Sequence, residues 1–416
     1  MKKVLVPRVR FKGFSEEWKE ERLENIYSFA SEGGTPDTNK DIYYKPGLFY
    51  FTKIEDMANK YIYHTKSKIS ELGLKNSSAW IIPKNNILFS NGATIGNVSI
   101  NKVDLSTKQG IVGMIIKKKF NLEFIYYLLK SENFQSKIAE KITVGTIPTV
   151  AIFNLKKIEL FLSKNIYEQQ KIGKLLENID NLISLEQSKL NKLKQLRETL
   201  LQKMFPEGNS KTPRIRFKGF EGEWSEEKLE EVGQTYIGLS GKTKKDFGHG
   251  NSRYITYLNI FNNPIANLKG LDRIEEDCKQ NSVKYGDIFV TTSSEIPEEV
   301  GITSIWPFKD KENIYLNSFC FGIRLNNINN YYINFLAYNL RNNELRKDIV
   351  LLAQGISRFN ISNRRFMKLN ILLPNISEQQ KIGDFFCKID TLINLYNSKL
   401  NKLKQIKEAL LQKMFV

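Results

Sequence analysis

Apolar side chains recur at intervals of three and four positions along two long stretches of the chain, residues 172–205 and 382–416. The apolar positions of the first stretch are Leu175, Leu176, Ile179, Leu182, Ile183, Leu190, Leu193, Leu196, Leu200 and Met204. Those of the second are Phe385, Phe386, Ile389, Leu392, Ile393, Leu400, Leu403, Ile406, Leu410 and Met414. This spacing is typical of an amphipathic helix. At 1.5 Å per residue, the pattern predicts two helices of about 35 residues, each roughly 50 Å long.

The two helical stretches are near copies of each other, and other segments of the chain also occur twice. Residues 7–14 return as 213–220, 168–173 as 378–383, 188–194 as 398–404, and 200–205 as 410–415. A period of about 210 residues is too long for a solenoid repeat, so it indicates a duplicated unit. Residues 32–103 and 237–306 lie between the shared segments and show little resemblance to each other. The chain therefore repeats its framework and varies its contents.

Residues 10–162 and 216–373 carry short runs of β-branched and aromatic side chains, which favour strands. These runs are residues 47–51, 87–89, 111–116, 254–257 and 287–290, and short helices are predicted at 122–130 and 333–341. The predicted fold class is α+β, with two mixed α/β domains and two long, coiled-coil-like helices in an internal duplication. The predicted boundaries are a first domain at 1–165, a first long helix at 166–206, a second domain at 207–375 and a second long helix at 376–416.

Two packing arrangements suit the long helices. Heptad-like apolar positions with Lys and Gln between them fit a coiled-coil pair. A single amphipathic helix more often covers the core of its own domain. Two near-identical helices that follow dissimilar domains favour seams that meet the same surface, which is either the other helix or two copies of one partner.

The composition points to a partner class. The 416 residues carry a formal net charge of +18, and 12% of them are aromatic. The basic residues are spread over the whole length rather than gathered in one tail, although a basic composition can simply aid solubility. Aromatic side chains among basic ones fit a surface that meets phosphates and bases. Nucleic acid is therefore the leading partner class.

The cysteines and the apolar runs bear on the location of the protein. Cys278, Cys320 and Cys387 are far apart and form no Cys-x-x-Cys motif, so neither a disulfide framework nor a metal site is expected. No run approaches the roughly 18 apolar residues of a membrane span. The apolar stretch near Met1 is too short for a signal peptide. We expect a soluble, cytoplasmic protein without membrane contact.

The sequence shows no recognisable catalytic machinery. Its two histidines, His64 and His249, are far apart and lack metal-ligand spacing. Gly241-Lys242-Thr243 resembles the end of a phosphate-binding loop, but that motif needs a glycine where Tyr236 stands. We therefore predict no catalytic residue. A stand-alone DNA-modifying or DNA-cleaving enzyme with an unrecognised site is the alternative, and an adaptor that binds only protein is a third possibility.

Several glycine-rich segments carry hydroxyl, amide and basic side chains that suit DNA. Arg and Lys pair with guanine, Asn and Gln pair with adenine, and hydroxyls bind phosphate. Each segment alone also fits an ordinary turn, because Gly, Ser and Asn are common turn residues. The DNA-binding candidates are Thr35, Ser90, Asn91, Thr94, Lys108 and Gln109 in the first domain, and Ser240, Lys242, Thr243, Lys244, Arg253, Tyr254, Thr292, Ser293, Ser357, Arg358 and Asn360 in the second. We expect Arg358 at a base edge and Lys242 at a phosphate.

These motifs resemble, over the whole chain, those of the DNA specificity subunit of Type I restriction-modification systems. Glu168-Gln169-Gln170-Lys171-Ile172 and its copy at 378–382, together with Leu-Leu-Gln-Lys-Met-Phe at 200–205 and 410–415, carry the resemblance most strongly. Gly33-Gly34-Thr35-Pro36 and Ser90-Asn91-Gly92-Ala93-Thr94-Ile95-Gly96 look like the target-recognition loops of that family. Residues 145–149 depart from the Gln-Pro-Asn-like turn that related domains often carry, and Thr146 is a further DNA-binding candidate there.

The resemblance implies a non-catalytic subunit of a bacterial defence system. In that family, two variable recognition domains each read one half of a split duplex DNA site. The resemblance further implies that two conserved long helices pack antiparallel, as spacer and docking platform, in a pseudo-twofold arrangement. Two methyltransferase subunits, which bind adenosylmethionine and methylate adenine, and ATP-driven restriction and translocase subunits are implied as partners. Adenosylmethionine, ATP and Mg²⁺ are expected on those partners, and no cofactor is expected on this chain. The expected docking positions on the helices are Ile172, Leu176, Ile179, Ile183, Leu193, Leu200, Ile382, Phe386, Ile389, Ile393, Leu403 and Leu410.

The duplication leads to the same kind of target by a separate route. Two copied helices that pair about a pseudo-twofold axis resemble an isologous dimer. Such a dimer with identical domains would read a palindrome. Because the two domains differ, we expect an asymmetric bipartite DNA site.

Overall fold

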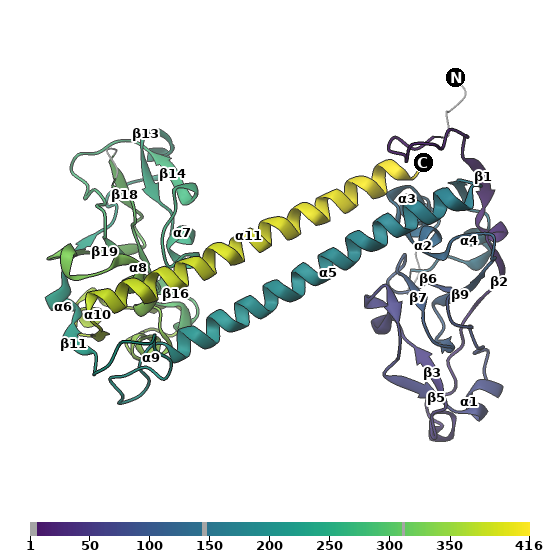
Figure 1. Cartoon of the computed structure of the whole chain (residues 1–416), viewed down its shortest axis with the longest axis horizontal. Coiled ribbons are helices and arrows are strands. Elements are labelled where there is room, and N and C mark those ends of the chain that lie inside the picture. Colours follow the sequence, from purple (N-terminus) through teal and green to yellow (C-terminus); the bar gives the residue numbers. More distant parts are fainter. Residues whose placement is uncertain (1–5, 144–147, 310–312) are drawn as a thin grey trace. The chain divides into compact units, whose positions relative to one another are not determined.

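The computed structural model describes residues 6–143, 148–309 and 313–416. The chain forms two compact units: unit 1 comprises Met1–Gln187 and Ser398–Val416, and unit 2 comprises Ser188–Asn397. The long helices are α5, Ile166–Lys203, and α11, Ile376–Met414, drawn in teal and yellow in Figure 1. Each unit therefore contains a globule, the first part of one long helix and the last part of the other.

Unit 1 is built around a five-stranded sheet in the order β2-β9-β6-β7-β4. Its strands are β2 (Tyr27–Glu32), β4 (Tyr61–Ile62), β6 (Ile87–Ser90), β7 (Val98–Asn101) and β9 (Ile111–Ile116). A second sheet holds β3 (Phe49–Thr52), β5 (Ser67–Ile69) and β8 (Leu105–Thr107), and β1 (Lys19–Arg22) pairs with β10 (Glu159–Leu162). The short helices are α1 (Glu71–Lys75), α2 (Leu122–Lys130), α3 (Glu132–Ala139), α4 (Ile152–Lys156) and the 3-10 turns Leu23–Asn25, Asp41–Tyr43 and Ile54–Ala58.

Both faces of the five-stranded sheet are covered, which explains why all four residues of β6 are buried. Successive side chains point to opposite faces of a strand. Ile87 and Phe89 join the large core that includes α2, whereas Leu88 joins a smaller cluster with Leu105. The sheet is therefore a rigid support for the loops at its ends.

Unit 2 has a four-stranded antiparallel sheet in the order β12-β19-β15-β17. Its strands are β12 (Gly233–Ile237), β15 (Ile288–Thr291), β17 (Thr303–Ile305) and β19 (Cys320–Leu325). Three smaller sheets hold β13 (Phe247–Ile255), β14 (Leu271–Ile274) and β18 (Ile314–Leu316); β11 (Ser225–Lys228) and β21 (Asn370–Leu373); and β16 (Ser293–Ser294) and β20 (Phe359–Asn360). The helices are α6 (Leu229–Val232), α7 (Tyr257–Asn262), α8 (Ile333–Asn339), α9 (Asn343–Leu351), α10 (Asn363–Phe366) and the 3-10 turns Lys244–Asp246, Leu268–Gly270, Pro297–Glu299 and Ile328–Asn330.

In each unit the two helix segments pair with each other and also cover the core. In unit 1, Lys407 of α11 pairs with Asp180 at 2.6 Å, and Lys399 pairs with Glu186 at 3.0 Å. The later residue of α5, Glu186, pairs with the earlier residue of α11, Lys399, so the two helix segments are antiparallel. The unit 1 core takes in Ile172, Leu176, Met414 and Phe415, and the unit 2 core takes in Leu201, Met204, Phe205, Ile382 and Phe386. Both packing arrangements expected from the sequence therefore hold.

The repeated motifs close each unit through a buried ion pair. In unit 1, Arg10 donates to Glu168 from Nε at 2.5 Å and from Nη2 at 2.9 Å. In unit 2, Arg216 donates in the same way to Glu378 at 2.7 Å from both nitrogens. Both carboxylates are fully buried. The copied Arg-x-Arg-Phe and Glu-Gln-Gln segments are therefore a structural clamp at the start of each long helix.

The predicted fold class is confirmed, with two mixed α/β globules and two long helices. α5 and α11 begin at Ile166 and Ile376, but the compact units are not the four predicted blocks of sequence. Each unit also includes the far end of a helix that starts in the other one, because residues such as Phe415 complete its core. Within the described residues, none of the helices combines the length and the apolar character that a membrane span requires.

Candidate nucleic-acid interface

Three of the predicted DNA-binding segments of unit 1 lie side by side at one end of the main sheet. The N–H groups of Asn91 and Gly92 both donate to the carbonyl of Gly110, at 3.1 and 3.3 Å. The N–H of Gly33 donates to the carbonyl of Ile111 at 3.0 Å. The three segments meet because β2 and β6 both run antiparallel to β9. The first segment follows the end of β2, the second follows the end of β6, and the third directly precedes the start of β9. The loops around residues 33–36, 90–96 and 108–110 therefore form one surface.

A fourth segment joins this surface through Thr143, Thr149 and Val150. Thr143 and Thr149 exchange backbone hydrogen bonds at 2.9 and 3.2 Å, and Val150 N–H donates to the Asn91 carbonyl at 2.8 Å. The Asn91 side chain returns a hydrogen bond to the Val150 carbonyl at 3.2 Å. The candidate Thr146 lies outside the described residues.

The unit 1 candidates divide into groups that shape the loops and groups that face outward. Ser90 and Asn91 are buried, and the Ser90 hydroxyl accepts the N–H of Asn97 at 2.9 Å. Thr35, Thr94 and Gln109 are exposed and Lys108 is half-buried. Ser90 and Asn91 therefore hold the loop in place, while the other four remain candidates for direct DNA contact.

Unit 2 builds the corresponding surface from the same pairing of two segments. Ser293 and Ser294 of β16 pair with Asn360 and Phe359 of β20, and the Ile361 N–H donates to the Thr292 carbonyl at 2.9 Å. This repeats the contact between residues 91–92 and 149–150 in unit 1. The two units therefore present two loops of equivalent position with different side chains.

Arg358 is held beside a pocket of about 440 Å³ on this surface of unit 2. Its Nε and Nη2 lie 3.3 and 3.2 Å from the Ser293 hydroxyl oxygen, which accepts both hydrogen bonds. Tyr257 and the exposed ring of Phe319 also line this pocket. Burial raises the pKa of Tyr257, so its hydroxyl stays protonated at neutral pH. Arg358 is thus oriented before any DNA arrives, and Ser357 and Asn360 are exposed near it.

The remaining unit 2 candidates, Ser240, Lys242, Thr243, Lys244, Arg253 and Tyr254, lie on or beside the sheet of β13, β14 and β18. Lys242 is not a free cation, because its Nζ lies 2.9 Å from Asp277 Oδ2. The hydrogen bond from Lys242 lowers the pKa of Asp277 to about 2 and raises the pKa of Lys242. The Thr243 N–H and hydroxyl both donate to Asp246. A phosphate must therefore compete with Asp277 for Lys242.

Half of the predicted docking positions on the long helices are buried in their own unit, and the other half are partly exposed. Ile172, Leu176, Ile179, Ile382, Phe386 and Ile389 are buried, and Ile183, Leu193, Leu200, Ile393, Leu403 and Leu410 are half-buried. The apolar stripe of each helix packs against the core of its unit and against the paired helix. Beyond Tyr167 and Ile376 in the first turns, the exposed large apolar side chains of the two long helices are Leu182, Leu185 and Ile406 in unit 1, and Leu392, Leu395 and Leu196 in unit 2.

These exposed side chains follow the internal repeat. Leu182, Leu185 and Leu196 of α5 correspond to Leu392, Leu395 and Ile406 of α11. Because each unit takes its helix segments from both helices, each displays one copy of the same three positions. Both units therefore expose the same three repeat positions to solvent.

Sequence reasoning missed a link between each globule and its helix pair. In unit 1, the hydroxyl of Tyr127 on α2 donates to Asp180 at 2.6 Å, and Asp180 also pairs with Lys407. In unit 2, Tyr338 on α8 donates to Asp390 at 2.9 Å, and Asp390 pairs with Arg197. Burial first, and then the neighbouring carboxylate, raise the pKa of both tyrosines. The available signal was that Tyr and Asp recur at the repeat distance in both halves.

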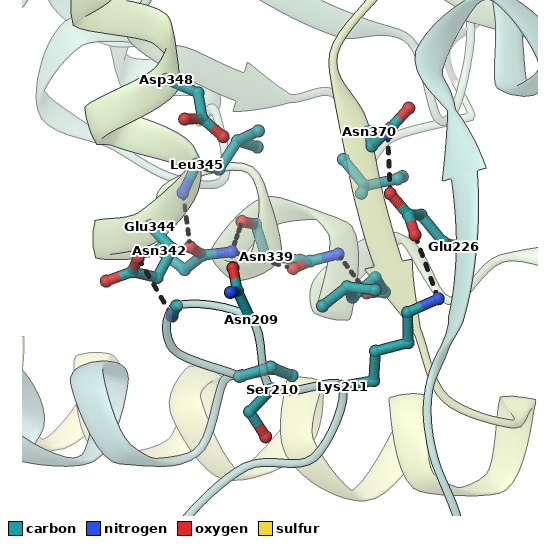
Figure 2. A pocket seen from close by; sticks show the side chains of 14 residues that line it. Asn209, Ser210, Lys211, Glu226, Asn339, Asn342, Glu344, Leu345, Asp348 and Asn370 are labelled. Atoms are coloured by element: carbon teal, nitrogen blue, oxygen red, sulfur yellow. Dashed lines mark hydrogen bonds and ion pairs between the residues drawn. The ribbon is translucent and has the colours of Figure 1, made fainter.

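A pocket of about 380 Å³ in unit 2 lies beside the linker that follows α5, and its polar groups are occupied with one another. Figure 2 shows Lys211 and Asn370 both reaching Glu226, at 3.1 and 2.7 Å. Glu344 accepts the N–H of Gly208 at 3.3 Å. The pocket carries more carboxylates than cations, so it does not suit phosphate. Among the described residues there is also no cluster of three His, Cys, Asp or Glu side chains that would hold a metal ion.

Comparison with known proteins identifies relatives of both halves of the chain. The family model described as Type I restriction modification DNA specificity domain matches residues 15–195 and 221–405. The Type I restriction enzyme MjaIX specificity subunit of Methanocaldococcus jannaschii is 31% identical over 193 residues, which is 45% of this chain and 44% of the relative. This match thus spans less than half the length of that relative. The MjaVIII specificity subunit of the same organism is 22% identical over 362 residues, 80% of this chain and 78% of the relative.

Two solved structures share the fold over nearly the whole chain. The crystal structure of a Type-I restriction-modification system S subunit from M. genitalium gives a TM-score of 0.63 at 17% identity, and covers 99% of each chain. A structure from work on complex assembly and conformational transition of the type I R-M system gives 0.55 at 17% identity, over 95% of this chain and 96% of that one. At such low identity, these similarities establish the shared fold.

Proposed function

Since the chain belongs to the Type I restriction modification DNA specificity domain family, we propose that it is the DNA specificity subunit of a Type I restriction-modification complex. One observation carries this proposal. The two units share a frame and a pair of loops of equivalent position, but these loops differ in their side chains. A protein with this construction is suited to read two different half-sites with one geometry.

In the proposed mechanism, each unit reads one half of a split duplex site through its loop surface. Basic side chains and hydroxyls bind phosphate and set the register, and polar side chains at base edges select the sequence. The exposed Thr94 and Gln109 are suited to this role in unit 1, and Arg358 in unit 2. Two weak readers on one chain raise each other's effective concentration, so strong binding needs both half-sites on one duplex.

We assign the docking of partner subunits to the exposed apolar positions of the long helices. Each unit presents the same set, with Leu182, Leu185 and Ile406 in unit 1. Exposed apolar groups that recur in this way suit two copies of one partner. We propose that these partners are two methyltransferase subunits, which carry adenosylmethionine and methylate adenine, and that restriction subunits using ATP and Mg²⁺ join them.

The chain itself supplies target recognition and no chemistry in this proposal. Incubation of the isolated chain with labelled adenosylmethionine, Mg²⁺ and DNA separates this proposal from the alternative of a stand-alone enzyme. We expect neither methyl transfer nor cleavage. Turnover by the isolated chain would instead support the enzyme.

The decisive experiment is to sequence methylated DNA from cells that produce this chain with its methyltransferase partner. We expect methylated adenines within a motif of two short sequences separated by unspecified bases. Cells with the methyltransferase alone are the control and should lack that motif. A single uninterrupted motif would contradict the assignment of one half-site to each unit.

A further inference from the structure

Ile356 has the most exposed large apolar side chain among the described residues, with 99% of it accessible. Isolated apolar residues on a protein surface are common and by themselves need no explanation. This one stands at the tip of a hairpin, residues 354–360, on the candidate DNA surface of unit 2. The position of Ile356 on that hairpin distinguishes it from an isolated surface residue.

The hairpin is closed by its own backbone. Gln354 N–H donates to the Asn360 carbonyl at 2.9 Å, and Asn360 N–H donates back to the Gln354 carbonyl at 2.8 Å. Gly355 has a φ of 142°, and a Cβ there would lie 2.0 Å from the carbonyl oxygen of Arg358. Only glycine fits this turn without distortion. The sequence thus specifies a tight turn that presents the side chain after Gly355.

The base of the hairpin is anchored in unit 2. β20 pairs with β16, and the buried Ile361 joins the large core. Arg358 is held by the hydroxyl of Ser293 through two hydrogen bonds. The hairpin therefore presents Ile356 to solvent from an anchored base.

The neighbours of Ile356 indicate which surface it meets. Gln354, Ser357 and Arg358 are exposed and carry groups that hydrogen-bond to base edges. The major groove of B-DNA, about 12 Å wide, admits protein elements and presents a distinct pattern for each base pair, whereas the minor groove, about 6 Å wide, largely separates only A·T from G·C. Among the base edges in the major groove, the distinctive apolar group is the C5-methyl of thymine.

We propose that Ile356 reads the C5-methyl group of a thymine in the half-site that unit 2 recognises. This inference rests on the proposed function and adds a specificity residue to it. The interaction is dispersion and burial of two apolar groups, with no hydrogen bond. Removing one methyl from such a contact weakens binding about fourfold, which corresponds to the ~0.8 kcal/mol of one buried methylene-sized group.

The test uses the full chain assembled with its methyltransferase partner and a duplex carrying the site found by methylation sequencing. Each thymine of the unit 2 half-site is replaced in turn by deoxyuridine, which lacks only the methyl group. For the unaltered chain, we expect about fourfold weaker binding at one position. For Ile356→Ala, we expect weaker binding to the thymine duplex and no further loss with deoxyuridine at that position.

Leu351→Ala is the matched control, because Leu351 is also apolar and 81% exposed but lies on α9 outside the hairpin. It should leave every thymine-to-deoxyuridine ratio unchanged. The proposal is overturned if no deoxyuridine position weakens binding, if Ile356→Ala keeps the full ratio, or if that variant fails only in assembly with the methyltransferase. Failure of the unaltered complex to prefer its site would instead refute the proposed function.

Discussion

The two units keep the same backbone contacts and change the side chains beside them. In unit 1, Gly110 directly precedes β9, and its carbonyl accepts the N–H of Asn91. In unit 2, Phe319 directly precedes β19, and its carbonyl accepts the N–H of Thr292 at 3.1 Å. One unit therefore shows bare backbone where the other shows an aromatic ring that is 56% exposed.

The frame tolerates far less change than the loops, because it contains buried charge. Glu168 and Glu378 are fully buried, and each depends on one arginine for its charge partner. Removal of one member of a buried pair leaves an uncompensated charge, whereas surface loops tolerate substitution. Recognition can thus change by replacement of loops without disturbance of the clamp. The following predictions test whether the two units share one structural framework while their recognition loops act independently.

The largest effect is expected from a break in the clamp of one unit. Arg216→Ala leaves Glu378 without its partner and should destabilise unit 2 by about 3–5 kcal/mol. Hydrogen exchange measured by mass spectrometry should show faster exchange in β11, β21 and the first turns of α11. The globule of unit 1 should exchange as before.

Arg214→Ala is the control for this experiment. Arg214 lies two residues away in the same segment, and its exposed side chain pairs with the partly buried Glu207 at 3.0 Å. Such a pair contributes about 0–1 kcal/mol, so exchange should hardly change. Equal effects of the two variants would show that the clamp does not hold unit 2 together.

The next effect tests whether the units share a partner surface. Leu185→Glu places a charge on the exposed set of unit 1, and burial of an unpaired charge in an interface costs several kcal/mol. Native mass spectrometry should then find one methyltransferase subunit per chain instead of two. Leu395→Glu should do the same, and the double variant should retain none.

Ser184→Glu adds the same charge at an exposed polar position of α5 and serves as the control. It should keep two methyltransferase subunits. If Leu185→Glu also keeps both copies, the exposed apolar positions are not the docking surface. The two units would then share their structural framework but not a docking surface at these positions.

A third prediction concerns the recognition loops of unit 2 only. Arg358→Ala should relax the preference at one base pair of the unit 2 half-site by about 1–3 kcal/mol and leave the unit 1 half-site unchanged. Ser293→Ala should act at the same base pair with a smaller loss of about 1 kcal/mol, because Ser293 only positions the guanidinium. Binding to a set of single-base variants of the site measures both effects.

Arg364→Ala is the control, since Arg364 is an exposed arginine of α10 on the same unit. It should weaken binding to all sequences alike or not at all. A loss of preference in the unit 1 half-site after Arg358→Ala would show that the two surfaces are coupled rather than independent.

The frame was predictable from the sequence because local periodicity and repetition encode it. The three-and-four spacing places both long helices, and the repeat implies two units of one design. The division of each helix between units was not predictable, since it depends on Phe415 and Phe205 filling cores remote in sequence from their helix starts. The same spacing does not distinguish positions that pack in the core, such as Ile179, from positions that face solvent, such as Leu182.

The candidate site was predictable as a set of loops but not as individual contacts. Composition marks residues 90–96 and 354–360 as polar turns, and the structure brings each beside a second such segment. Burial then separates the roles, because Ser90 is fully enclosed while Thr94 faces outward. The pairing of Lys242 with Asp277 joins residues 35 positions apart through a tertiary contact, and no local pattern reveals it.

That ion pair gives the smallest expected effect and the finest test of a difference between the units. Asp277→Asn should release Lys242 to bind phosphate, so that DNA affinity rises for all sequences and the salt slope steepens by about 0.9. Lys242→Ala should not steepen the salt slope, and the double variant should behave like Lys242→Ala.

Because the pKa of Asp277 is lowered to about 2, the pair of Lys242 and Asp277 is intact above the usual carboxyl range and is lost only as pH falls toward 2. The gain should therefore be constant between about pH 5 and 8. Asp272→Asn also removes one negative charge, on β14 beside Tyr254, and controls for the change in net charge. If it steepens the slope as much as Asp277→Asn does, Lys242 is not the released cation.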